Sequence, residues 1–334
     1  MILNPAIIAL ILGSLLLSLF AVYSSAIGWR IIRRWDIRSG SELQVSLERK
    51  TYLISTVLAY LMGFQLFSFF LFIYTSDVLH EIFIGAMCAA GTLNVDPHGY
   101  PALLVKIANV VSCGVWLSMN HIDNQAEDYP LIRPKYKFLM FLTGMLLLET
   151  YLQLRYFSGM RADVITSCCG TLFSESSETI TGELAGIPSI ASQIILFASF
   201  LLTIRVGGYY LWTGKGAKAF SRMSVWFFVF ALVALISFIS LYYYELPTHH
   251  CPFCVLQKEY HYIGYPMYIT LLTGSIFGIS VGLMNRYRDI DSLKSIIAKI
   301  QVRWCWAAML SYLAFMLIAL YPMIFSDFHL EGSL

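Results

Sequence analysis

Apolar residues in this chain are gathered into long blocks, and polar residues fill the segments between them. Each block is long enough to cross a hydrocarbon core about 30 Å thick as one helix. Helices are expected because backbone polar groups inside lipid have to be satisfied within their own segment. The pattern therefore predicts an all-α polytopic membrane protein with eight transmembrane helices. The blocks cover approximately residues 5–27, 52–76, 101–120, 137–157, 188–206, 222–244, 266–284 and 304–324.

Composition supports the same class. The 334 residues are 58% hydrophobic and 13% charged, with a mean hydropathy of +0.69, whereas a soluble domain carries roughly 25% charged residues. No basic residue precedes the first block, and the first arginine, Arg30, follows it. A cleaved signal peptide has a basic start, so we expect the first block to be a retained helix.

The basic residues predict the orientation. Nearly all Lys and Arg residues fall in the segments 28–50, 121–137, 205–222 and 285–303, and the exceptions are Lys106, Arg155, Arg161 and Lys258. By the positive-inside rule these four segments are cytoplasmic. Both termini are then outside, and the expected location is the bacterial inner membrane. The net charge of +2 follows from this bias, so no nucleic-acid partner is expected.

The chain can be divided into two units of four helices. Cys88 is followed by Gly99-Tyr100-Pro101, and Cys254 is followed at nearly the same spacing by Gly264-Tyr265-Pro266. One interpretation is a duplication into parallel repeats, with units 1–157 and 188–334 joined by an outer cysteine loop, 158–187. The other interpretation is that any outer loop leading into a helix favours Gly and Pro.

Two segments are predicted to lie at the membrane surface. Asp289–Arg303 spaces apolar residues at helical intervals, which predicts a helix lying on the inner surface. Tyr242, Tyr243 and Tyr244 mark the outer end of the sixth helix, where aromatic rings are typical interfacial anchors.

Two ionisable residues fall inside predicted helices, Lys106 in the third and Glu149 in the fourth. Unpaired charges in lipid are costly, so we expect these two to pair, and such residues are candidates for function. In the alternative interpretation, Lys106 extends its amino group to the surface and Glu149 is protonated.

Five of the seven cysteines fall in loops predicted to be outside, and two of these form the motif Cys251-Pro252-Phe253-Cys254. The thiols of a CxxC motif can close a small disulfide ring or share a metal. An oxidising exterior permits the disulfide. His249, His250 and His261 are near enough in sequence to tune a thiolate. Redox activity, metal binding and a structural disulfide all stay open, although so short a ring removes little chain entropy.

The other cysteines are solitary or adjacent. Cys168 and Cys169 are neighbours in the outer loop, where each is expected to pair elsewhere or to bind a soft metal, because a bond between them is strained. Either is a candidate shuttle partner for the CxxC pair or for Cys88. Cys113 and Cys305 are expected to be small apolar helix residues. No two histidines lie mid-helix as axial haem ligands would, so no haem is predicted.

The run from Cys251 to Lys258, CPFCVLQK, at the mouth of a helix resembles the DsbB and vitamin K epoxide reductase group of quinone-linked membrane thiol oxidoreductases. Members are built on four-helix bundles and carry a basic residue, usually arginine, four positions after the second cysteine, where this chain has Lys258. The resemblance implies a quinone beside the CxxC cysteines, with Lys258, Gln257 and His261 as candidate cofactor-binding residues. It also implies exchange with a second cysteine pair. This chain differs in having eight helices and no second spaced pair.

The resemblance thus implies an enzyme that moves electrons from a soluble extracytoplasmic dithiol protein to quinone. It also implies that Lys258 and the N-terminus of the seventh helix stabilise the thiolate of Cys251 or Cys254. The expected catalytic residues are Cys251, Cys254, Cys168, Cys169 and Cys88. A second hypothesis is transport of copper, zinc or mercury through these cysteines, although no ladder of ligands crosses the helices. A third is a non-catalytic subunit of a respiratory complex, with other membrane subunits as partners.

Overall fold

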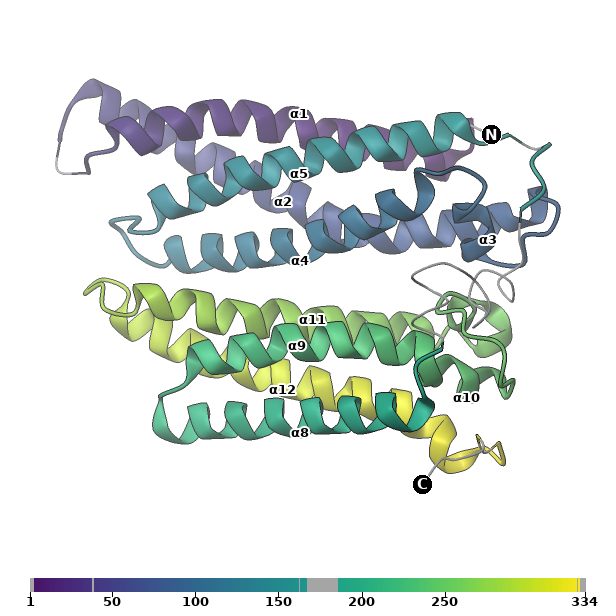
Figure 1. The fold of residues 1–334 in the computed structure, drawn as a ribbon. Helices are drawn as coiled ribbons and strands as arrows, with labels where there is room; N and C mark the ends of the chain where they lie inside the picture. The colour runs from purple at the N-terminus through teal and green to yellow at the C-terminus, as the bar shows by residue number, and fades with distance from the viewer. Residues whose placement is uncertain (1–2, 38, 162, 167–185, 329, 331–334) are drawn as a thin grey trace. The chain divides into compact units, whose positions relative to one another are not determined.

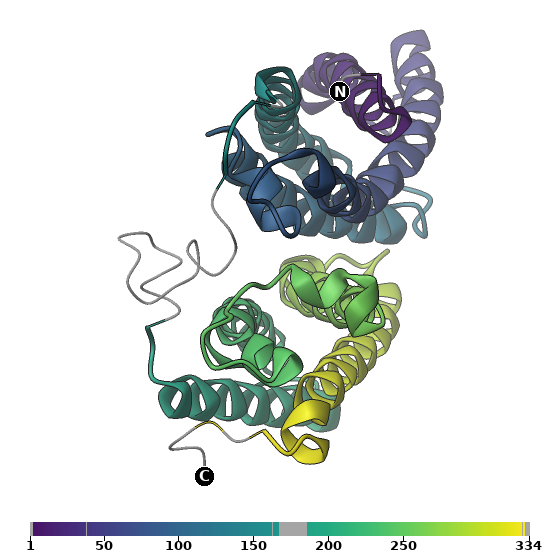
Figure 2. The same cartoon turned by 90° about the vertical axis from the view of Figure 1, so that its right-hand side faces the viewer.

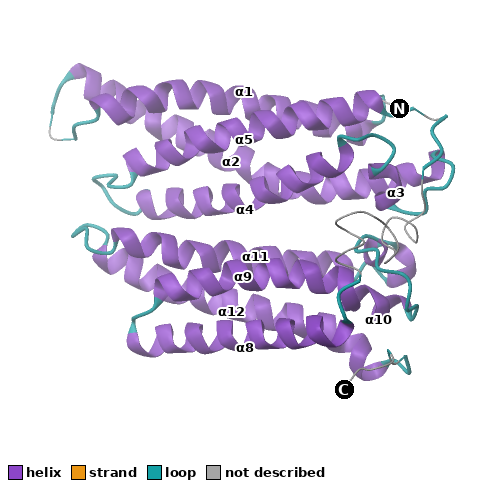
Figure 3. Cartoon of the chain, in the orientation of Figure 1, coloured by secondary structure: helices purple, strands orange, loops and turns teal. Residues whose placement is uncertain are grey.

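A computed structural model describes residues 3–37, 39–161, 163–166, 186–328 and 330 of the chain. Within these ranges the chain forms helices and no strand (Figures 1 and 3). Cys168 and Cys169 lie outside the described residues, so their predicted role stays a prediction.

Eight helical spans, counted over the described ranges, are long and apolar enough to cross a membrane. The prediction of an all-α polytopic membrane protein is therefore confirmed. The sixth span is α9 (Ala217–Ala234), continued by the π-helical turn η2 (Leu235–Ile239) and by α10 (Ser240–Tyr244). The other spans are α1 (Pro5–Arg34), α2 (Glu42–Val78), α4 (Gly99–Asp123), α5 (Ile132–Gly159), α8 (Ser189–Thr213), α11 (Gly264–Met284) and α12 (Lys294–Phe325).

The helices fall into two compact units. Unit 1 comprises Met1–Thr75, Asp96–Met160 and Arg286–Ile300, and within it α5 packs against α1 and α4. Unit 2 comprises Ser76–Val95, Arg161–Asn285 and Gln301–Leu334, and within it α9 packs against α8 and α11. Figure 2 looks along the helices and shows them running side by side within each unit. The segment with Cys88 thus belongs to the same unit as the CxxC loop, and the duplication stays a prediction.

The eighth span begins well before its apolar block. The prediction of a separate surface helix over Asp289–Arg303 is wrong, because α12 runs without a break from Lys294 into the apolar block. No Gly or Pro interrupts the helical pattern there, so helix propagation continues. Leu293 and Ile297 are fully buried, which holds this first part of α12 by packing.

A glycine stripe lets α11 approach its neighbours closely. Gly274, Gly278 and Gly282 recur every fourth residue on this helix. A Cβ at Gly274 would lie 2.5 Å from the Tyr312 ring of α12, and one at Gly278 would collide with Ser224 of α9. Small residues at this spacing allow close helix packing in lipid. These glycines therefore allow close packing of the helices that carry the CxxC loop.

Candidate functional site

Unit 2 brings together three cysteines from two loops that are 163 residues apart in the chain. The sulfurs of Cys88 and Cys251 lie 3.5 Å apart, and the Cys254 sulfur completes a group whose members are all within 4.8 Å of one another. The Cys88–Cys251 separation exceeds the roughly 2.05 Å of a disulfide bond. Cys88 and Cys251 are fully buried, and Cys254 is 6% exposed. Three of the five predicted catalytic residues therefore meet, and they come from two loops that are distant in sequence.

The CxxC loop is held at its start by His250. The Nδ1 atom of His250 lies 2.9 Å from the carbonyl oxygen of Ile236, which belongs to the π-helical turn η2. Since a carbonyl oxygen only accepts, Nδ1 carries the proton of this bond. Wide turns of this kind are frequent at functional sites. His250 therefore fixes the position of the residue before Cys251.

Two tyrosines hold the backbone of the CxxC loop itself. The Tyr244 hydroxyl donates to the Cys251 carbonyl oxygen at 2.5 Å and accepts from the Val255 N–H at 2.9 Å. The Tyr268 hydroxyl donates to the Pro252 carbonyl oxygen at 2.6 Å. Tyr242 and Tyr244 are buried, so the prediction that they are interfacial anchors is wrong. Tyr244 turns inward because its hydroxyl satisfies one backbone group at the start of the motif and one just after its end.

His249 is the histidine of this loop that the structure places against a cysteine. Its Nε2 atom lies 3.4 Å from the Cys254 sulfur. Its ring packs edge-on against Tyr244, with centroids 4.6 Å apart and an interplanar angle of 82°. The ring is therefore oriented with Nε2 toward the thiol. The sequence named three candidate histidines without distinguishing them.

Asp77 and Gln257 join the two cysteine loops. The Gln257 side-chain amide donates to Asp77 Oδ1 at 2.9 Å and to the Met87 carbonyl oxygen at 3.1 Å. Asp77 Oδ1 also accepts from the N–H of Ala89, the first residue of the short helix α3 (Ala89–Leu93), at 3.2 Å. Gln257 thus positions the Cys88 loop beside the CxxC loop. The sequence analysis did not single out Asp77, although an acidic residue at the end of an apolar block was a usable signal.

The expected stabilisation of a thiolate by the N-terminus of the seventh spanning helix is not observed. Cys254 begins only the three-residue turn η3 (Cys254–Leu256), and α11 begins later, at Gly264. A second turn, η4 (Lys258–Tyr260), lies between them. Lys258 is exposed on this turn. The CPFC run is followed by a compact connection rather than directly by a helix.

An open apolar groove of about 530 Å³ lies next to the CxxC loop. Tyr260 is one of its walls, and the Tyr260 ring is 4.7 Å from the Tyr244 ring. Burial, together with the neighbouring Cys254, raises the pKa of the Tyr260 phenol, so this side chain is neutral at physiological pH. The remaining lining residues are Tyr243, Glu259, His261, Ile263, Leu317, Ile318 and Tyr321.

The start of the outer cysteine loop is bonded to the Cys88 loop. The Thr166 N–H donates to the Ile84 carbonyl oxygen at 3.0 Å, and the Thr166 hydroxyl donates to the Gly91 carbonyl oxygen at 2.9 Å. Gly85 has φ +90 and passes close to the Thr166 carbonyl, so a side chain there would collide with it. The last described residue before Cys168 is therefore attached to the segment that carries Cys88.

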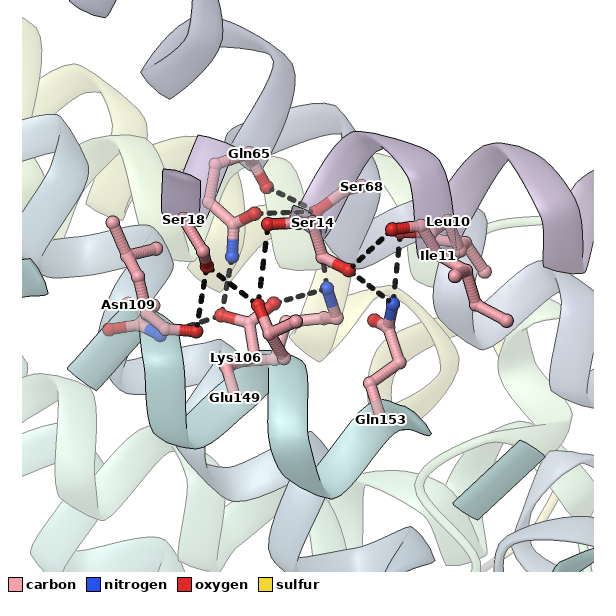
Figure 4. A network of polar contacts seen from close by, with 12 residues as sticks. Leu10, Ile11, Ser14, Ser18, Gln65, Ser68, Lys106, Asn109, Glu149 and Gln153 are labelled. Atoms are coloured by element: carbon pink, nitrogen blue, oxygen red, sulfur yellow. Dashed lines mark hydrogen bonds and ion pairs between the residues drawn. The ribbon is translucent and has the colours of Figure 1, made fainter. Parts of the chain in front are cut away.

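Unit 1 contains a buried ion pair between Lys106 and Glu149, as predicted (Figure 4). Lys106 Nζ lies 2.5 Å from Glu149 Oε1, and both side chains are almost completely buried, so Lys106 does not extend to the surface. The amides of Gln65 and Asn109 donate to Glu149 Oε2 at 2.5 and 2.6 Å. Lys106 also donates to Ser68 at 3.2 Å. This carboxylate is therefore bonded by side chains from α2 and α4.

A second buried pair in unit 1 was not predicted. Lys135 Nζ lies 2.5 Å from Asp123 Oδ2, and both side chains are fully buried. The sequence analysis assigned Lys135 to a cytoplasmic loop. In the structure α5 begins at Ile132, which places Lys135 in its first turn and turns it against Asn120 and Asp123 at the end of α4.

In comparisons with known proteins, no family model, no curated protein and no solved structure matches the chain.

Proposed function

We propose that the chain is a membrane thiol–disulfide oxidoreductase that passes electrons from a dithiol protein to quinone through Cys88, Cys251 and Cys254. The supporting observation is the 3.5 Å separation of the Cys88 and Cys251 sulfurs, beside the CxxC partner Cys254. Thiol–disulfide exchange needs an attacking sulfur, a central sulfur and a leaving sulfur in one place. This cluster supplies all three.

Each sulfur has a distinct role in the proposed cycle. When Cys251 and Cys254 form a disulfide, the Cys88 thiolate attacks the Cys251 sulfur. A Cys88–Cys251 bond forms as the Cys251–Cys254 bond breaks, and Cys254 leaves as a thiolate. His249 Nε2, at 3.4 Å from that sulfur, is placed to hydrogen-bond the leaving thiolate. A substrate dithiol then reduces the Cys88–Cys251 bond and becomes a disulfide itself.

The cycle closes with a quinone. Oxidation of the Cys251 and Cys254 thiols to a disulfide releases two electrons and two protons, which convert one quinone into one quinol. The groove beside Tyr260 is within the roughly 300–1,000 Å³ range of small-molecule sites. His261 lines it, in keeping with its expected cofactor role. Lys258 is a weaker candidate because it is exposed, and Gln257 acts in joining the loops.

The basic residues support an orientation in which the cysteine loops face outside a bacterial inner membrane. The partner is then a soluble extracytoplasmic dithiol protein. Cys168 and Cys169 are proposed as the thiols that meet this partner first, since their loop begins with Thr166 on the Cys88 segment.

The test is differential thiol labelling with peptide mass spectrometry on purified protein. A small dithiol is added first and a short-chain quinone second. We expect Cys251 and Cys254 to become labelled after the dithiol and to lose labelling together after the quinone. Cys305 on α12, whose sulfur lies against Met309 and not against a cysteine, is the matched control and should not respond. Thiols that stay labelled after quinone would overturn the proposal.

A further inference from the structure

The sulfurs of Cys88, Cys251 and Cys254 lie within 4.8 Å of one another, and the His249 ring lies against one of them. The Cys88 and Cys251 sulfurs are 3.5 Å apart, and His249 Nε2 lies 3.4 Å from the Cys254 sulfur. With Zn–S bonds of about 2.3 Å and Zn–N bonds of about 2.0 Å, tetrahedral ligands are about 3.4–3.8 Å apart. We infer that the reduced site binds a thiophilic cation, with Cys88, Cys251, Cys254 and His249 as its four ligands.

The donor set selects the class of cation. The group of Cys88, Cys251 and Cys254 offers three soft thiol ligands and no carboxylate, and the His249 imidazole beside Cys254 is a borderline ligand. A tetrahedral site with sulfur and nitrogen donors favours Zn²⁺ over hard cations such as Mg²⁺ or Ca²⁺. Binding removes the three thiol protons, so about three protons are released for each ion bound.

The surroundings hold the ligands in place before any ion arrives. Tyr244 fixes the Cys251 carbonyl and also packs against the His249 ring. Asp77 and Gln257 hold the Cys88 loop against the CxxC loop. Partners of this kind orient metal ligands and raise affinity. The burial of all three cysteines excludes water, as a closed four-ligand site requires.

The site connects metal binding with redox state. A disulfide between any two of the cysteines removes two of the four ligands, so oxidation has to release the ion. This consequence rests on the proposed function, whereas the metal site itself rests on the geometry alone. The cation would then keep the three thiols from exchange until it leaves.

The experiment uses the full-length protein in detergent, reduced with a phosphine and freed of metal with a chelator. It is titrated with Zn²⁺ and the bound ion is counted by mass spectrometry after desalting. Co²⁺ is used in a parallel titration for its absorption spectrum. We expect one ion per chain and the intense bands of a tetrahedral cobalt–thiolate site. Cys88→Ala and His249→Gln should weaken binding by more than the roughly 10- to 100-fold that loss of an outer partner costs.

Two control variants and a quinone-oxidation experiment distinguish failure of the metal site from failure of the proposed function. Cys305→Ala removes a buried thiol elsewhere, and His261→Gln removes an exposed histidine of the same loop, so both should bind as wild type. Circular dichroism and gel filtration check that each variant is folded. Equal Zn²⁺ binding by all four variants, or no binding by the wild type, would overturn the metal site. If Zn²⁺ binds but quinone never forms the Cys251–Cys254 disulfide, the metal site stands and the proposed function fails.

Discussion

At the scale of single residues, Tyr244 shows how a side chain from a spanning helix organises a reactive loop. Its one hydroxyl bonds the carbonyl of Cys251, the first residue of the CxxC motif, and the N–H of Val255, the residue after the motif. Both backbone groups are buried with their residues. Buried polar groups left without partners cost free energy, so this hydroxyl stabilises the loop conformation.

Replacement of Tyr244 by phenylalanine should loosen the loop while leaving the ring in place. Loss of these bonds is expected to cost about 1–3 kcal/mol, because two buried backbone groups lose their partner. Cys251, which is fully buried, should then be alkylated by iodoacetamide about 5- to 150-fold faster in the native protein. Tyr243→Phe is the control, since that hydroxyl donates to Ile318 outside the loop. An unchanged rate in Tyr244→Phe would contradict this role.

At the scale of secondary-structure elements, Glu149 joins three helices of unit 1. Its carboxylate on α5 receives Gln65 from α2 and both Lys106 and Asn109 from α4 (Figure 4). Association of helices in lipid relies on such polar contacts and on close packing, because lipid chains are as apolar as the helix surfaces. The network therefore specifies which faces of these helices meet.

Removal of one charge of this pair should be worse than removal of both. Lys106→Met leaves a buried carboxylate without its counter-ion and is expected to cost about 3–5 kcal/mol. The double variant Lys106→Met, Glu149→Gln should recover much of that loss, because no charge stays buried. Detergent-induced unfolding of purified protein measures both. Lys137→Met, an exposed change on α5, the helix that carries Glu149, is the control. Equal stability of Lys106→Met and Lys137→Met would contradict this account.

At the scale of the whole chain, the fold of unit 2 unites segments from both halves of the sequence. The Ser76–Val95 segment is contributed to unit 2 by the end of α2 and the loop that follows it. Cys88 is thereby placed beside a motif 163 residues later. The candidate chemistry exists only because this long-range contact forms.

The contact can be captured covalently. In Cys254→Ala, the oxidant diamide should form a Cys88–Cys251 disulfide, since closing the 3.5 Å gap to about 2.05 Å needs only a small shift. Linked peptides identified by mass spectrometry report the bond. The variant Cys88→Ala, Cys254→Ala should give no linked peptide. Recovery of fully alkylated Cys251 from oxidised Cys254→Ala would show that the loops do not meet.

The sequence by itself determined the eight apolar spans and the all-α class, and it indicated that lone charges such as Lys106 and Glu149 need partners inside the protein. These follow from local composition, because lipid is a nearly uniform solvent that penalises any exposed backbone group or lone charge. The partner of Lys135 escaped prediction because helix α5 begins at Ile132, and Lys135 lies in its first turn rather than in a loop. The early start of α12 at Lys294 was not predicted, because an apolar block marks the part of a helix inside lipid and not the ends of the helix.

Only the tertiary structure decided which residues make the candidate site. Spacing along the chain identifies the CxxC pair but cannot bring Cys88 to it, since that proximity depends on packing and on the Asp77–Gln257 bond between loops. The choice of His249 over His250 and His261 likewise depends on the π-helical turn that engages His250 and on the Tyr244 ring that orients His249. Side-chain directions in a loop are set by such distant contacts, which no local pattern encodes.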